Sequence, residues 1–237
     1  SDRVPTPVSE LHATLDEVGP LLAADDTDRA GSLGAAADRL EVVDRALRGV
    51  PGLLSLRADR VGTDRMAVAV DGLAAAVAAV EALFDDPHTA PPADQLEAVN
   101  AALLRCKDAL WAISRDRLRA VREVDALVGA SYDADGGNEA GLAVALSLHQ
   151  ALSALDRLEV RGRDSAGLEV QLTGHGLDAE DTAVAAALAA RGAMSFTNGS
   201  LRLSDGALVA VHKAAAEIGE LGDNTTTNRS YPTAVIY

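Results

Sequence analysis

Apolar residues recur at three- and four-residue steps along the first half of the sequence, and this spacing constrains the fold more than any other feature. The first apolar set consists of Leu11, Leu15, Val18, Leu21 and Leu22. A helix places residues with this spacing on one face. Comparable spacing continues to about Ala130. We therefore expect four long amphipathic helices joined by short loops, which is the pattern of an antiparallel helical bundle over residues 7–130.

Turn-forming and capping residues divide this stretch into its helices. Asp26 and Thr27 are suitable caps for a second helix that runs to about Leu47, and Pro51-Gly52 breaks the chain after it. The third helix carries apolar positions from Val68 to Leu83. The fourth begins near Ala93 and extends through Val124.

The composition agrees with a helical core and excludes some partners. Hydrophobic residues make up 48% of the chain and aromatic residues only 3%. This favours closely packed Ala- and Leu-rich helices over a β-sandwich. The formal charge of −15 disfavours nucleic acids and anionic membrane surfaces, because both bind basic protein faces.

Three further observations favour a cytoplasmic protein. A single cysteine, Cys106, cannot form an internal disulfide, which fits a reducing compartment. No apolar run reaches the roughly 18 residues that a membrane span needs. The first residues do not resemble a signal peptide.

Residues 129–139, "GASYDADGGNE", are rich in glycine and turn-forming residues, and the residue pattern changes after them. The following region predicts mixed α and β structure. We expect a helix from Glu139 to Leu158, a strand over Leu168–Leu172 and a helix over Asp178–Arg191. Residues 194–211 predict a hairpin that turns at Asn198-Gly199. The predicted fold class is therefore α+β, with a bundle at 7–130, an α/β unit at 139–222 and a tail at 223–237.

Isolated reactive residues do not form a convincing site. Cys106 lies among leucines in the fourth helix, so we expect a buried structural thiol. The five histidines, at positions 12, 88, 149, 175 and 212, have no partner at helical spacing, and we expect no metal or cofactor. Arg115, Arg119 and Arg122 share a helix face with interleaved acids, which predicts a solvated, ion-paired face.

The run "RLEVRGRDSAGLEV" at residues 157–170 is the strongest candidate for a site. Two glycines and an Asp-Ser pair favour a polar turn between the helix before it and the strand after it. The run resembles the segment RLEYRGYDSAG of the glutamine-dependent glucosamine-6-phosphate synthases, and it differs only at Val160 and Arg163. This resemblance implies a partial αββα N-terminal-nucleophile glutaminase unit, with glutamine and fructose 6-phosphate as the substrates of the parent family.

The resemblance also implies which residues line the substrate pocket, namely Arg161, Gly162, Asp164, Ser165 and Gly167. It does not supply a catalytic residue. The family uses an N-terminal cysteine as nucleophile and an HTRWA-like segment to hold glutamine, whereas this sequence starts at Ser1 and contains no such segment. We expect this chain alone to be inactive. The alternatives are a non-catalytic helical module that binds a protein partner, with a homo-oligomer also compatible, or a fragment without activity.

Overall fold

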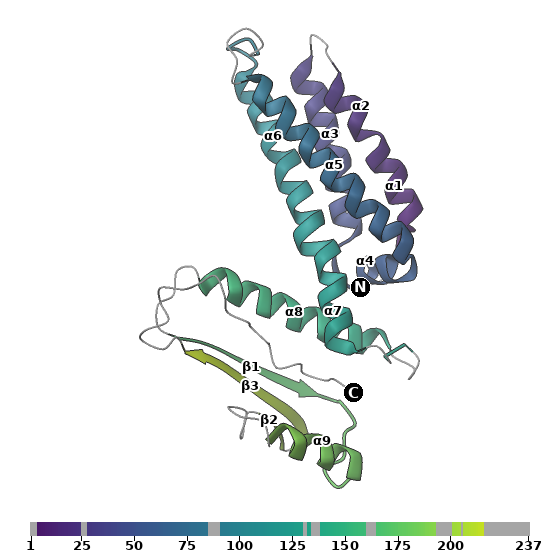
Figure 1. Cartoon of the computed structure of the whole chain (residues 1–237), viewed down its shortest axis with the longest axis vertical. Coiled ribbons are helices and arrows are strands. Elements are labelled where there is room, and N and C mark those ends of the chain that lie inside the picture. Colours follow the sequence, from purple (N-terminus) through teal and green to yellow (C-terminus); the bar gives the residue numbers. More distant parts are fainter. Residues whose placement is uncertain are drawn as a thin grey trace. The chain divides into compact units, whose positions relative to one another are not determined.

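The structure is a computed structural model that describes residues 4–24, 28–84, 91–129, 132–133, 138–159, 165–192, 201–204 and 206–215. The described residues are mostly helical and include one small antiparallel sheet (Figure 1), which confirms the predicted α+β class. The chain divides into two compact units, and the division falls between Leu146 and Ser147. Each unit is described by itself below.

Helices make up the first unit. They are α1 (Val8–Asp16), α2 (Val18–Ala23), α3 (Arg29–Ala46), α4 (Gly49–Ala58), α5 (Arg60–Phe84), α6 (Leu96–Trp111), the π-helical segment η1 (Ala112–Leu118) and α7 (Arg119–Val128). In Figure 1, α1 continues into α2, and α6 continues through η1 into α7. Together with α3 and α5 they form four rods that alternate in direction. The α1–α2 rod contacts α3 and α5, and α6 contacts the same two helices, so the four rods enclose one core.

The core of this unit consists of leucines, valines and small residues from every rod. Its largest fully buried side chains include Leu15, Leu22, Leu33, Leu40, Leu56, Met66 and Ile113. The first half of α8 (Glu139–Glu159) adds Leu142, Ala145 and Leu146 to the same core. The first unit therefore continues past residue 130, where the composition changes.

Two local predictions in this unit are wrong. Pro51-Gly52 does not break the chain, because Pro51 lies in the first turn of α4, where its missing N–H costs no helical hydrogen bond. The break comes earlier, at Leu47-Arg48, and Gly49 adopts a φ of 71° there. The fourth rod begins at Leu96 rather than near Ala93.

Asp28 caps α3, because its carboxylate accepts a hydrogen bond from the Gly31 N–H at 3.0 Å. The caps predicted from the sequence, Asp26 and Thr27, lie outside the described residues.

Helix α5 departs from the expectation about membrane spans. It is the one described helix that is long and apolar enough to cross a membrane by length and composition, with a mean hydropathy of 1.9 over 18 residues. From Met66 to Phe84 its charged residues are Asp71 and Glu81 alone, which explains this value. The helix also contributes Met66, Val70 and Val77 to the bundle core.

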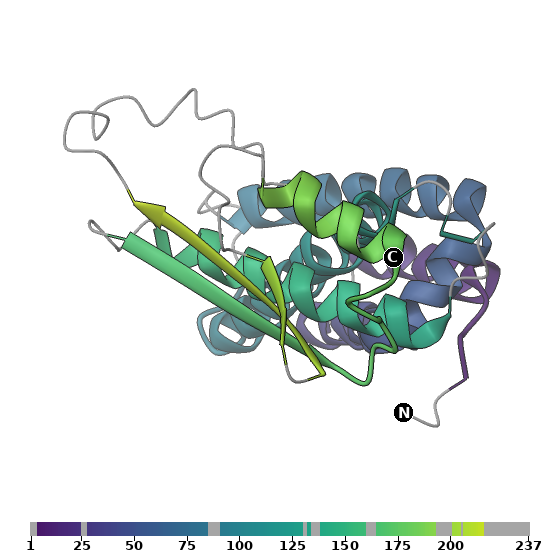
Figure 2. The same ribbon diagram turned by 90° about the horizontal axis from the view of Figure 1, so that it is seen from below.

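The second unit contains the sheet. Its elements after α8 are β1 (Ser165–Thr173), α9 (Thr182–Gly192), β2 (Leu201–Ser204) and β3 (Ala207–Ala215). The strand order is β1-β3-β2 and both pairings are antiparallel. Figures 1 and 2 both show β1 and β3 side by side, and α9 contacts β2. The N-terminus of α9 is capped by Asp181, which accepts from the Ala183 N–H at 2.7 Å, as its acidic start predicts.

The hairpin that the structure describes in this unit joins β2 to β3. Ser204 pairs with Ala207, so the connection is residues 205–206, and Gly206 has a φ of 75°. Asp-Gly favours two-residue hairpin turns as Asn-Gly does, so the sequence contained two comparable signals. Asn198-Gly199 and the tail at 223–237 lie outside the described residues.

Candidate functional site

The predicted pocket motif spans the junction between α8 and β1. Helix α8 ends at Glu159 and β1 begins at Ser165, while Arg161, Gly162 and Asp164 lie outside the described residues. Ser165 and Gly167 are the first and third residues of β1. They pair with Ala215 and Lys213 of β3. The described part of the motif is therefore the start of a strand, and that strand is three residues longer at its N-terminus than predicted.

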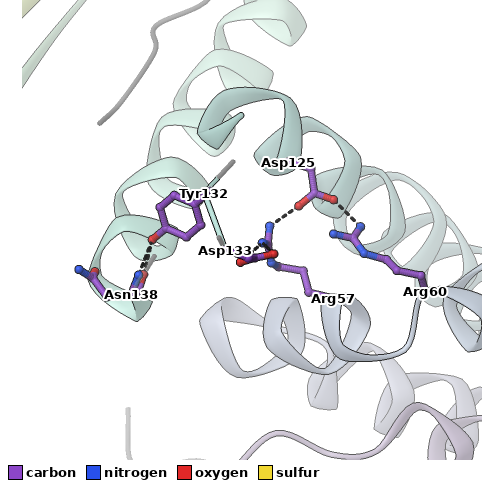
Figure 3. Close-up of polar contacts among 6 residues, drawn as sticks. All are labelled: Arg57, Arg60, Asp125, Tyr132, Asp133 and Asn138. Atoms are coloured by element: carbon purple, nitrogen blue, oxygen red, sulfur yellow. Dashed lines mark hydrogen bonds and ion pairs between the residues drawn. The ribbon is translucent and has the colours of Figure 1, made fainter. Parts of the chain in front are cut away.

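A cluster of charged side chains around Arg57 forms a polar network in the first unit (Figure 3). Arg57 extends from α4, and only 8% of its side chain is exposed. Its guanidinium donates to Asp125 of α7 and to both carboxylate oxygens of Asp133, at 2.7 and 2.8 Å. Arg60 also pairs with Asp125, and this bond raises the pKa of Arg60. Each carboxylate in the cluster thus has a cationic partner.

Tyr132 extends this network to the start of α8. The Arg57 guanidinium lies 5.9 Å from the centroid of its ring, within the range of a cation–π contact. Its hydroxyl donates to the Asn138 carbonyl and accepts from the Asn138 N–H at 3.0 Å. Asn138 in turn accepts from the Gly141 N–H at 2.9 Å, which caps α8. These contacts hold Tyr132 and Asp133 against Arg57 of α4 and cap the first turn of α8.

A second polar contact is buried between rods. Asp44 of α3 is only 4% exposed, and it accepts from Arg117 Nε at 2.9 Å and from Arg48 Nε at 3.0 Å. Arg117 belongs to η1, and π-helical turns frequently occur at functional positions. Sequence reasoning missed this contact. The signal was present, because Asp44 follows Leu40 by four residues and so falls on the buried face of α3.

The one cysteine is buried, as predicted. Cys106 has an exposed fraction of 0%, and its sulfur lies 3.7 Å from the Leu33 carbonyl oxygen. Burial raises the pKa of its thiol to about 11. A thiol in this environment is a weak nucleophile at neutral pH.

Three of the five histidines, His12, His149 and His175, have side chains that the structure describes, and each contacts a different partner. His12 lies 3.0 Å from the Gly62 carbonyl oxygen, and His149 is buried with its Nε2 3.5 Å from the Ser153 hydroxyl. His175 Nδ1 accepts from the Leu177 N–H at 2.9 Å. Within the described ranges, no three His, Cys, Asp or Glu side chains are grouped so that they could hold a metal ion.

The arginine face of the fourth rod is partly ion-paired. Arg119 bonds to Glu123 at 3.3 Å, and Arg115 and Arg122 are exposed. Asp125, which the sequence places among these arginines, pairs with Arg57 and Arg60 instead. The face is solvated, as predicted, and Arg119 of this face pairs with Glu123.

Comparisons with known proteins give no assignment. No protein-family model matches the chain, and no curated protein or solved structure matches it either. The function therefore has to be argued from the motif at 157–167 and from the arrangement of its neighbours.

Proposed function

We propose that the chain is part of a glutamine amidotransferase of the glucosamine-6-phosphate synthase type, which transfers the amide nitrogen of glutamine to fructose 6-phosphate. The observation that carries this proposal is the run "RLEVRGRDSAG" at residues 157–167. Nine of its eleven positions are those of the family segment that it resembles. The proposed pocket residues are Arg161, Gly162, Asp164, Ser165 and Gly167.

The order of local structure supports the proposal. The 21-residue helix α8 ends inside the run at Glu159, and a nine-residue antiparallel strand begins inside it at Ser165. A polar turn that joins a packed helix to a sheet strand is a common position for ligand-binding residues. Within the proposal, the partial αββα glutaminase unit begins in the second half of α8, at Ser147 and not at residue 139, and it includes α9 and the sheet of β1, β3 and β2.

The chain by itself has no nucleophile for this chemistry. Glutamine hydrolysis in this family requires a thiolate to attack the amide carbon, and Cys106 is fully buried with a raised pKa. We therefore assign no catalytic residue. The role of this chain in the proposal is to shape the glutamine pocket and to support the strand that follows it.

The test uses the complete reading frame that encodes the chain. We expect that frame to contain a Cys-Gly-Ile start and a His-Thr-Arg-Trp-Ala segment, and its product to release glutamate from glutamine and to aminate fructose 6-phosphate. Asp164→Asn should lower kcat/KM for glutamine by at least tenfold, because a charge-assisted contact in the pocket is lost. Glu180→Gln is the matched control, since Glu180 is an exposed carboxylate before α9. A product that hydrolyses no glutamine, or equal activity in both variants, contradicts the proposal.

A non-catalytic helical interaction module is the second candidate. It is favoured by the bundle, which has a core of its own and exposes large apolar side chains on α5 and α6. An intact reading frame without the two family segments would favour this module over the enzyme.

A further inference from the structure

We draw no further inference here: the strongest candidate, the exposed apolar surface patch of α5 and α6 around Trp111, also carries exposed acidic side chains such as Asp71 and Asp108, and nothing among the residues that the structure describes shows what covers it.

Discussion

The two units of the molecule are stabilised in different ways. The first unit encloses a continuous core of leucines and valines, and its buried Arg57 and Asp44 have charged partners. In the second unit, Val209 is the one buried hydrophobic residue among the side chains that the structure describes. Its described part is defined mainly by backbone pairing of β1, β3 and β2. Side-chain burial specifies the bundle, whereas strand register specifies the sheet.

This difference concerns the range of the contacts as well as their number. A helix forms from residues three and four positions apart, so the bundle needs long-range contacts only to bring finished rods together. The ladder between β1 and β3 pairs Ser165 with Ala215 and must close a long loop before any pairing stabilises it. We therefore expect perturbations of the first unit to cost more free energy of unfolding than perturbations of the α8–β1 junction.

The largest expected effect on the free energy of unfolding comes from shortening the first unit at its C-terminal end. A fragment of residues 7–146 should melt cooperatively, because it contains the whole core, including Leu142, Ala145 and Leu146. A fragment of residues 7–130 should still fold but lose about 3–6 kcal/mol of unfolding free energy, since burial of one leucine contributes about 1.5–3 kcal/mol. Urea denaturation followed by circular dichroism measures both.

Identical unfolding midpoints for the two fragments would show that α8 is not part of the bundle. A non-cooperative transition in 7–146 would contradict the independence of the first unit altogether, because it would mean that these rods need the second unit to bury their apolar faces.

The next effect concerns the Arg57 cluster within the first unit. Arg57→Ala removes a nearly buried cation from Asp125 and Asp133, while Arg60 still pairs with Asp125. We expect a loss of about 2–3 kcal/mol, because the buried stem of Arg57 and its charge-assisted hydrogen bonds are lost, whereas Asp133 is exposed and Asp125 keeps Arg60. Arg65→Ala, at an exposed arginine of α5, is the control and should stay within about 0.5 kcal/mol of the wild type. Equal unfolding midpoints for the two variants would show that the Arg57 cluster contributes no more to stability than an exposed surface contact.

A smaller effect is expected at the α8–β1 junction. If Asp164 pairs with Arg161 at this turn, Asp164→Ala should cost about 1–3 kcal/mol, because a charged group loses its partner. Gly162→Val should cost as much or more if Gly162 closes the helix in a left-handed conformation, which β-branched residues avoid. Glu97→Ala, at an exposed residue of α6, is the control. If all three variants have the same free energy of unfolding, the junction is an exposed polar turn.

The sequence allowed the rods to be predicted more fully than the contacts between them. Apolar spacing placed the helices, and the thiol of Cys106 was predicted to be buried from its leucine neighbours. The Arg117–Asp44 pair was not predicted, because its residues lie in two helices that are far apart in sequence. In addition, no local sequence pattern predicts a π-helical turn. The hairpin between β2 and β3 was not predicted, although its Asp-Gly dipeptide is as strong a turn signal as Asn198-Gly199, which lies outside the described residues.

The most direct comparison of the two units uses the thiol of Cys106. Its pKa is raised to about 11 in the folded chain, against about 8.5 when unfolded. Its contribution to stability is thus fully present below about pH 8.5 and is lost as the pH rises through 11. At pH 8, alkylation of this thiol requires the bundle to open. Arg57→Ala should therefore accelerate alkylation, whereas Asp164→Ala should leave the rate unchanged, because its junction lies in the other unit. If Asp164→Ala accelerates labelling as much as Arg57→Ala does, the two units unfold together and their independence is refuted.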